Sequence, residues 1–167
     1  MVLTKAELLA ALKHEVHILV HLSGKIDPAQ LDYRPTPKQR STFELLKYLT
    51  VMGPLMVQSA LSGKFETDAW GEASKAAAGR DLQGTIAAIQ AQPATYEKLL
   101  GPVPDSAFRE EVSIFGTPSS RGAFLVNLVL GGYAAYRTQL FVYLKACGRE
   151  ELTTMNLWAG VDPPPAP

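Results

Sequence analysis

Apolar residues recur along this chain at intervals of three and four residues, which is the spacing of one side of an α-helix. The first such stretch predicts a helix from about Thr4 to Ser23. Thr4 and Glu7 form the pattern of a capping box, and Gly24 stands where a helix is expected to end. The apolar stripe of this helix consists of Leu8, Leu12, Val16 and Leu19.

A second helix is expected from Ser41 to about Ser62, again with a capping box, formed by Ser41 and Glu44. The connection before it contains three prolines, which forbid a continuous helix there. Gly53 and Pro54 fall in the middle of the second helix, where the lost amide is expected to kink the helix without ending it. The buried stripe predicted for this helix is Leu45, Leu49, Met52 and Met56.

Two more helices complete the pattern. Asp81 is expected to cap a third one that reaches Leu100 and is interrupted at Pro93, whereas residues 64–80 before it give only a weak signal. The fourth begins near Ser119 or Ser120 and runs to Cys147. Because it is apolar nearly all round, we expect it at the centre of a bundle or covered by a second subunit.

Length and composition fit one all-α domain. A chain of 167 residues can bury a sizeable core, so residues 1–150 are expected to form a four-helix bundle with long proline-rich connections. Residues 151–167 are expected to be a C-terminal tail whose last, proline-rich residues are mobile.

Charge and hydropathy exclude several classes of function. The 16 basic and 16 acidic residues balance, which argues against binding to nucleic acid. No charge-free run is long enough for a convincing membrane span, and the N-terminal segment lacks the apolar core of a signal peptide. The single cysteine, Cys147, excludes an internal disulfide framework and is expected to be an inert thiol. A cytoplasmic protein is therefore expected.

Two segments resemble the DinB/YfiT-like family. Residues 31–49, LDYRPTPKQRSTFELLKYL, resemble the family's entry to its second helix, with an Arg-Pro pair, a Ser cap and Glu-Leu-Leu. The late segment Tyr136-Arg-Thr-Gln-Leu is similar to the family's His-Arg-Gly-Gln-Leu signature. The order and length of the elements match over nearly the whole chain. The resemblance implies a DinB-like four-helix bundle.

The resemblance also locates a site, and there this chain departs from the pattern. Metal-binding family members hold a divalent cation with three histidines, whose positions correspond to Tyr48, Gly132 and Tyr136. Glycine has no side chain to offer, and neutral tyrosine is a poor ligand for zinc or nickel, although two phenolates could bind ferric iron. We therefore expect no metal and no cofactor, with the two tyrosines filling the space and hydrogen-bonding to each other or to water.

The resemblance implies that a pocket remains between the second and fourth helices, with Met52, Arg137 and Gln139 as possible neighbours. Arg137 lies within an apolar helix, so it must find a partner, and Glu44 is suggested by the family pattern. Without a fixed cation, such a pocket suits a small neutral or aromatic ligand.

Three histidines share one face of the first helix: His14, His17 and His21. That face lies opposite the leucine stripe, so the imidazoles are expected at a solvated or subunit-facing surface. Two of them could hold a stray metal ion, but a functional metal site needs more ligands and a protected cavity.

Two classes of function follow. The first is a non-catalytic or small-molecule-binding DinB-like protein with a degenerate, metal-free site, expected to be a homodimer because the fourth helix is so apolar and relatives dimerise. The alternative is an enzyme similar to the family's thiol-dependent S-transferases, using Tyr48 and Tyr136 or an unrecognised metal site. Because tyrosine cannot replace a Lewis acid, the first is favoured.

Overall fold

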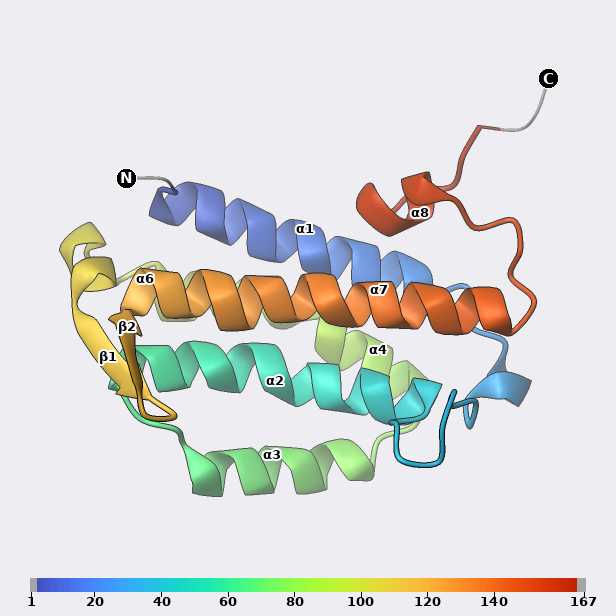
Figure 1. Ribbon diagram of the computed structural model, residues 1–167, viewed down its shortest axis with the longest axis horizontal. Helices are drawn as coiled ribbons and strands as arrows, with labels where there is room; N and C mark the ends of the chain where they lie inside the picture. Colours follow the sequence, from blue (N-terminus) through green and yellow to red (C-terminus); the bar gives the residue numbers. More distant parts are fainter. Residues whose placement is uncertain (1–2, 165–167) are drawn as a thin grey trace.

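The computed structural model describes residues 3–164 and shows long helices packed lengthwise into a bundle (Figure 1). The prediction of an all-α helix bundle is confirmed in its main helices, although short elements were missed. The elements that form the bundle are α1 (Lys5–Ser23), α2 (Thr42–Ser62), α4 (Leu82–Gln90), α5 (Gln92–Leu100), α6 (Arg121–Phe124) and α7 (Gly131–Ala146).

The first two helices begin as their sequences predict. Both capping boxes are present: the Thr4 side chain pairs with Glu7 in α1, and Ser41 pairs with Glu44 in α2. Helix α2 then runs through Pro54 and ends at Gly63, whose φ of 77° is in the left-handed region that favours glycine. The expectation that Pro54 does not end the helix is confirmed.

The third predicted helix is broken in two, as its proline suggested. The Asp81 carboxylate caps α4 by accepting a hydrogen bond of 2.7 Å from the Gly84 amide. Helix α4 ends at Gln90, and α5 starts at Gln92 with Pro93 in its first turn, where a missing amide costs nothing.

The fourth predicted helix has a different winding in its first part. Between α6 and α7 the segment η3 (Leu125–Leu130) is π-helical, and the Gly131 amide donates to the carbonyl of Val126, five residues back. The wider turn is accommodated directly before the Gly131-Gly132 pair, which has low helix propensity. Sequence periodicity over a single turn does not distinguish π- from α-helix, so this feature was not predicted.

A β-hairpin lies at the end of the bundle where α6 begins (Figure 1). Strand β1 (Glu111–Ile114) pairs antiparallel with β2 (Thr117–Ser120) and follows a short 3₁₀ turn, η2 (Asp105–Arg109). Phe115 and Gly116 form the tip with φ values of 60° and 78°. The second strand was not predicted, because its sequence shows no apolar alternation.

The weak segment before α4 forms a helix of its own, α3 (Thr67–Ala78), which packs against the outside of α2 (Figure 1). Only Ala77 of this helix is buried, so its sequence has almost no apolar stripe from which it could be predicted. The Lys47 ammonium donates a hydrogen bond of 2.7 Å to the Ala78 carbonyl and ties the helix end to α2.

The C-terminal region is more ordered than expected. It contains α8 (Thr154–Trp158), which starts with a Thr153–Asn156 capping box and packs on α1 and α7. Leu152 and Asn156 are buried. The segment from residue 151 therefore contains a packed helix that the prediction of a C-terminal tail did not include. The mobility predicted for the last, proline-rich residues concerns residues from 165 onward, which lie outside the described residues.

The core lies along the bundle axis, between α1, α2, α5 and the α6–α7 helix. A short 3₁₀ turn, η1 (Pro28–Gln30), occupies part of the proline-rich connection between α1 and α2. Among residues 3–164, none of the helices has the length and hydropathy needed to cross a membrane.

Candidate functional site

Helices α2 and α7 face each other across a cleft of about 360 Å³, which we call the tyrosine cleft. Tyr48 and Met52 line it from α2, and Gly132 and Tyr136 line it from α7. The structure thus brings together the three positions that the resemblance pointed to, with Met52 beside them. Further lining residues come from α2, the hairpin tip and η3: Met56, Phe115, Asn127 and Leu128.

The two tyrosines of the cleft contact each other loosely. The Tyr136 hydroxyl lies 3.4 Å from that of Tyr48, and the rings meet edge to face with centroids 5.1 Å apart. Burial and the hydrogen bond from Tyr136 hold the pKa of Tyr48 well above its usual value, although the nearby Arg40 acts in the opposite direction. Tyr48 is therefore protonated at neutral pH and acts as a neutral hydrogen-bonding group.

These residues do not fit a bound divalent metal. Position 132 offers no ligand, and a Cβ there would lie 3.3 Å from the Met52 methyl carbon, which occupies the adjoining space. A tyrosine with a raised pKa is a weak ligand because it must first lose its proton. Within residues 3–164, no three histidine, cysteine, aspartate or glutamate side chains are grouped as a metal site requires.

Aromatic rings continue from the cleft along the outside of α2. Trp70 of α3 lies 6.0 Å from Tyr48 between ring centroids, and Phe65 lies 5.3 Å from Trp70. Phe115 of the hairpin tip packs against Phe65 at 5.2 Å although its side chain is largely exposed. The hairpin therefore supplies Phe115 to the wall of the cleft, and α3 places Trp70 against Tyr48. The sequence revealed neither contact.

Arg137 and Gln139 are not at the cleft, contrary to expectation. Arg137 points to the other side of α7, where its Nε lies 2.7 Å from a carboxylate oxygen of Glu15 on α1. The proposed partner Glu44 is instead part of its capping box and pairs with Arg34 at 3.3 Å. Gln139 donates a hydrogen bond of 2.5 Å to the Tyr143 hydroxyl. Consecutive residues of a helix point in different directions, so Arg137 and Gln139 point away from the cleft although Tyr136 lines it.

The Glu15–Arg137 pair is almost completely buried, with 8% and 4% of the two residues exposed. The two facing atoms form a charge contact without an aligned hydrogen bond. Burial raises the pKa of Glu15, and the positive charge of Arg137 opposes that shift. The guanidinium also lies over the Trp158 ring at 4.5 Å and donates to the Leu157 carbonyl, so this pair anchors α8.

A second tyrosine pair lies in the core and was missed by the sequence analysis. Tyr96 of α5 and Tyr133 of α7 are fully buried, and their hydroxyls share a short hydrogen bond. Tyr133 donates to the Gln92 side-chain carbonyl at 2.6 Å, and the Gln92 amide donates to the Leu49 carbonyl at 2.9 Å. Every polar group of this network therefore has a partner.

Gly53 makes room for that network. A Cβ at position 53 would lie 2.0 Å from the Tyr133 hydroxyl oxygen and 2.1 Å from that of Tyr96. A glycine inside a helix costs about 1 kcal/mol relative to alanine, so its presence there was the available signal of a close approach.

The three histidines are placed between α1 and the C-terminal region. His14 and His17 are exposed, as expected, and His14 bonds through Nε2 to the Trp158 carbonyl at 2.9 Å. His21 is half-buried, which was not expected, because Asn156 lies over it at 3.0 Å. Burial and the nearby Lys25 lower the pKa of His21. Through the contacts of His14 and His21, the histidine face of α1 helps to hold α8 in place.

Cys147 follows α7 and is half-buried. Burial and the nearby Asp27 raise the pKa of its thiol above the usual value, so the thiolate is disfavoured at neutral pH.

Comparison with known proteins identifies the fold. No model of a known protein family matches the chain, and no curated protein matches it. Among solved structures, a DinB-like protein of Bacillus subtilis, YjoA, matches with a TM-score of 0.67 over 87% of this chain and 94% of that one. The two sequences are 18% identical, so the likeness establishes a DinB-like fold and leaves the chemistry to this chain's own residues.

Proposed function

We propose that this DinB-like protein binds a small neutral molecule with an aromatic group in the tyrosine cleft, without metal-assisted catalysis. The observation that carries the proposal is the composition of the cleft wall: among residues 3–164 it contains aromatic, methionine, leucine and small side chains with one amide, Asn127, and no charged side chain. Such a wall favours burial of a flat apolar ring and does not compensate a ligand charge.

The polar groups of the cleft suit a ligand with one or two hydrogen-bonding atoms. The Tyr48 and Tyr136 hydroxyls are joined only by a long contact of 3.4 Å, so each retains capacity for a ligand atom. Asn127, exposed at the rim, adds an amide that can both donate and accept. Met52 and Met56 can adapt their shape to a ring placed between the helices.

The S-transferase alternative receives no support from this geometry. A general base must lose its proton near neutral pH, whereas the pKa of Tyr48 is raised by burial and by Tyr136. In the described part of the chain, the side chains that line the cleft include no cation to stabilise a thiolate.

A matched pair of probes tests the proposal. Benzamide and benzoate have nearly the same shape, but only benzoate is charged at neutral pH. Saturation-transfer NMR should detect benzamide on the protein and much less benzoate. The variant Met56→Trp should block the cleft and abolish the benzamide signal, whereas Ala76→Trp, on the exposed side of α3, should leave it unchanged. Equal binding of both probes, or an unaffected Met56→Trp variant, would contradict the proposal.

We further propose that the chain forms a homodimer in the cytoplasm through the outer face of the fourth helix. Leu128 and Val142 are 43% and 53% exposed there, with the small residues Gly131 and Ala135 between them. Leu128, Gly131 and Ala135 also line the tyrosine cleft, so the partner subunit would lie against the mouth of that cleft. An apolar helix face of this length favours a self-complementary contact. Light scattering should give twice the chain mass of 18.1 kDa, and Val142→Glu should reduce it to the monomer value. A wild-type monomer at micromolar concentration would refute the dimer.

A further inference from the structure

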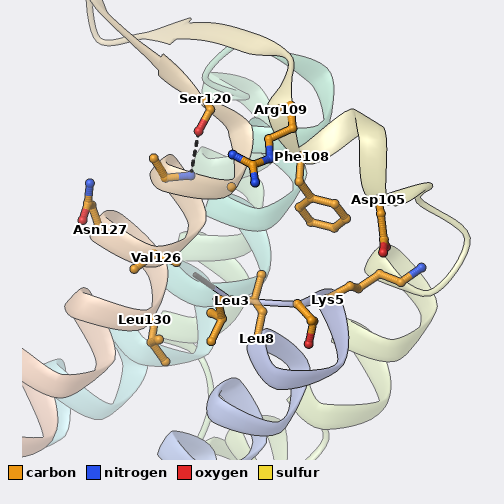
Figure 2. A pocket seen from close by; sticks show the side chains of 13 residues that line it. Leu3, Lys5, Leu8, Asp105, Phe108, Arg109, Ser120, Val126, Asn127 and Leu130 are labelled. Carbon is orange, nitrogen blue, oxygen red and sulfur yellow. Dashed lines mark hydrogen bonds between the residues drawn. The ribbon is translucent and has the colours of Figure 1, made fainter. Parts of the chain in front are cut away.

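A second and larger cavity, about 460 Å³, lies at the end of the bundle where α1 begins (Figure 2). We call it the amino-terminal cavity. It is bounded by the first turn of α1, by η2 and by the helix that continues from α6 into η3. Its volume is within the range of small-molecule sites in proteins. The tyrosines of the other cleft do not line it, and Asn127 is the residue common to the two.

The walls of the amino-terminal cavity are apolar. Leu3 and Leu8 come from the α1 side, Phe108 from η2, and Val126 and Leu130 from η3. Figure 2 shows these side chains around one hollow, with the Phe108 ring directed into it. Aliphatic side chains dominate, in contrast to the aromatic wall of the tyrosine cleft. A flexible hydrocarbon chain fits this surface better than a rigid ring does.

Most polar side chains of the cavity already have partners. The Lys5 ammonium donates to the carbonyls of Gly101 and Val103 at 2.9 and 2.8 Å. The Ser120 hydroxyl caps the following helix by accepting from the Ala123 amide at 3.2 Å. Thr4 is engaged in its capping box. These groups hold the rim together and have little capacity left for a ligand.

Arg109 is different, because within residues 3–164 its guanidinium has neither a hydrogen bond nor an ion pair in the structure. Figure 2 shows it at the edge of the cavity and pointing toward Ser120. The acidic residue of the cavity, Asp105, lies at the other end, where the Lys5 side chain extends. One end of an apolar cavity therefore carries a cation free to form two parallel hydrogen bonds to a carboxylate.

We propose that the amino-terminal cavity binds a medium-chain alkyl carboxylate. The hydrocarbon chain lies against Leu8, Val126 and Leu130, and the carboxylate pairs with Arg109 at the rim. The site is independent of the tyrosine cleft and adds an anionic, aliphatic ligand class to the neutral, aromatic one proposed there.

Calorimetric titration of the full chain with hexanoate, octanoate and decanoate, each below its micelle concentration, tests the apolar part. Burial of each additional methylene should strengthen binding by roughly fourfold until the cavity is filled. Val126→Trp should abolish the binding of octanoate, with thermal unfolding as the check that the variant is folded. An affinity that does not depend on chain length would overturn the proposal, and so would undiminished octanoate binding by a folded Val126→Trp variant.

The charged part is tested with headgroups of one chain length. Octanoate should bind about tenfold more tightly than octanol, and octylamine more weakly than either, because one charge-assisted contact at an exposed rim is worth about that factor. Arg109→Gln should remove the advantage of octanoate over octanol, whereas the matched variant Arg149→Gln, whose partner is Glu151, should retain it. Equal affinities for the three headgroups, or a preference for the amine, would contradict the role of Arg109.

To test whether the two sites are independent, each blocking variant is measured with the ligand of the other site. Met56→Trp should leave octanoate binding unchanged, and Val126→Trp should leave the benzamide signal unchanged. Octanoate binding that disappears in Met56→Trp would place the ligand in the tyrosine cleft and overturn the second site. Failure of benzamide to bind would concern only the function proposed for the tyrosine cleft.

Discussion

Two tyrosine pairs have hydroxyls in contact with each other, through Tyr133 and Tyr136 of α7, and the pairs differ in how completely these hydroxyls are hydrogen-bonded. Tyr133 and Tyr96 lie in the core, where their hydroxyls share a short hydrogen bond. The Tyr133 hydroxyl also donates a hydrogen bond to the Gln92 side-chain carbonyl. Tyr136 and Tyr48 lie half-buried at the cleft, with their hydroxyls 3.4 Å apart. The core hydroxyls are thus fully hydrogen-bonded within the protein, whereas the cleft hydroxyls share only one long contact.

The difference separates a structural role from a binding role. A buried hydroxyl that loses its partner costs the protein its desolvation energy, so the core pair must stay complete for stability. A half-exposed hydroxyl can exchange its partner for water or for a ligand at little cost. We therefore expect substitutions at the core pair to act on folding, and substitutions at the cleft pair to act on binding.

The largest effect is expected from Gly53→Ala. A Cβ at this position would overlap the hydroxyl oxygens of Tyr133 and Tyr96, at 2.0 and 2.1 Å, and force the network apart. Overpacking and two disturbed buried hydrogen bonds together should cost roughly 3–5 kcal/mol of the free energy of unfolding. Denaturant unfolding followed by circular dichroism measures this change.

Gly71→Ala is the matched control for that substitution. Gly71 also lies inside a helix, α3, but a Cβ there would meet nothing within 4 Å. Alanine should stabilise this helix by up to about 1 kcal/mol because of its higher helix propensity. If the two variants change stability alike, the glycine at position 53 is not required by the core tyrosines.

The pH dependence of stability should reveal the core pair next. Burial and the neighbouring tyrosine raise the pKa of Tyr96, and burial likewise raises the pKa of Tyr133, while Tyr96 partly offsets this through its hydrogen bond. Both groups stay neutral in the folded state, whereas in the unfolded chain they ionise near pH ~10. Their contribution to the free energy of unfolding is therefore fully present below about pH 10 and is lost as the pH rises toward their pKa values in the folded protein.

Compared with neutral pH, ionisation of each core tyrosine in the unfolded chain should lower the free energy of unfolding at about pH 11 by roughly 1.4 kcal/mol. The loss for the pair is then roughly 2.8 kcal/mol. The pKa of Tyr48 is also raised, so urea unfolding of the Tyr48→Phe variant at neutral and alkaline pH measures the loss from the core pair alone. Tyrosinate absorbance of the folded protein shows which groups ionise first. Ionisation of all six tyrosines of the chain near the ordinary pKa, before unfolding, would show that the core pair is open to solvent.

Tyr133→Phe should have a somewhat smaller effect. It keeps the ring but leaves the Gln92 carbonyl without its donor and Tyr96 without its acceptor, both in the core. One buried network opened in this way should cost about 2 kcal/mol of the free energy of unfolding. Chemical denaturation provides the measurement, and a change below about 0.5 kcal/mol would mean that the network contributes nothing to stability.

The sequence predicts the bundle better than it predicts the details of the site. Capping boxes and apolar stripes locate α1 and α2, because these are local rules that the packed structure does not override. The partner of Arg137 could not be predicted, since several carboxylates are compatible with one apolar helix and only packing chooses Glu15. The hairpin that supplies Phe115 to the cleft has too few apolar residues to show a pattern.

The metal positions illustrate the same limit. The resemblance pointed to Tyr48, Gly132 and Tyr136, and the structure places all three on one cleft. That Met52 occupies the space beside Gly132 follows from side-chain packing and is not visible in the sequence. The core network around Tyr133 was missed because an apolar stripe does not show which of its tyrosines bond to one another.

The smallest change in stability, and the sharpest test of the comparison, is expected from Tyr136→Phe. This hydroxyl is half-exposed and contributes only the long contact to Tyr48, so the free energy of unfolding should change by less than about 0.5 kcal/mol. Benzamide binding should nevertheless weaken, by a factor of about five, because the ligand loses one neutral hydrogen bond. The paired measurement is denaturant unfolding and NMR titration on Tyr136→Phe and Tyr133→Phe. A stability loss at position 136 as large as that at position 133 would make the cleft pair a second structural network, and the distinction between the two pairs would be lost.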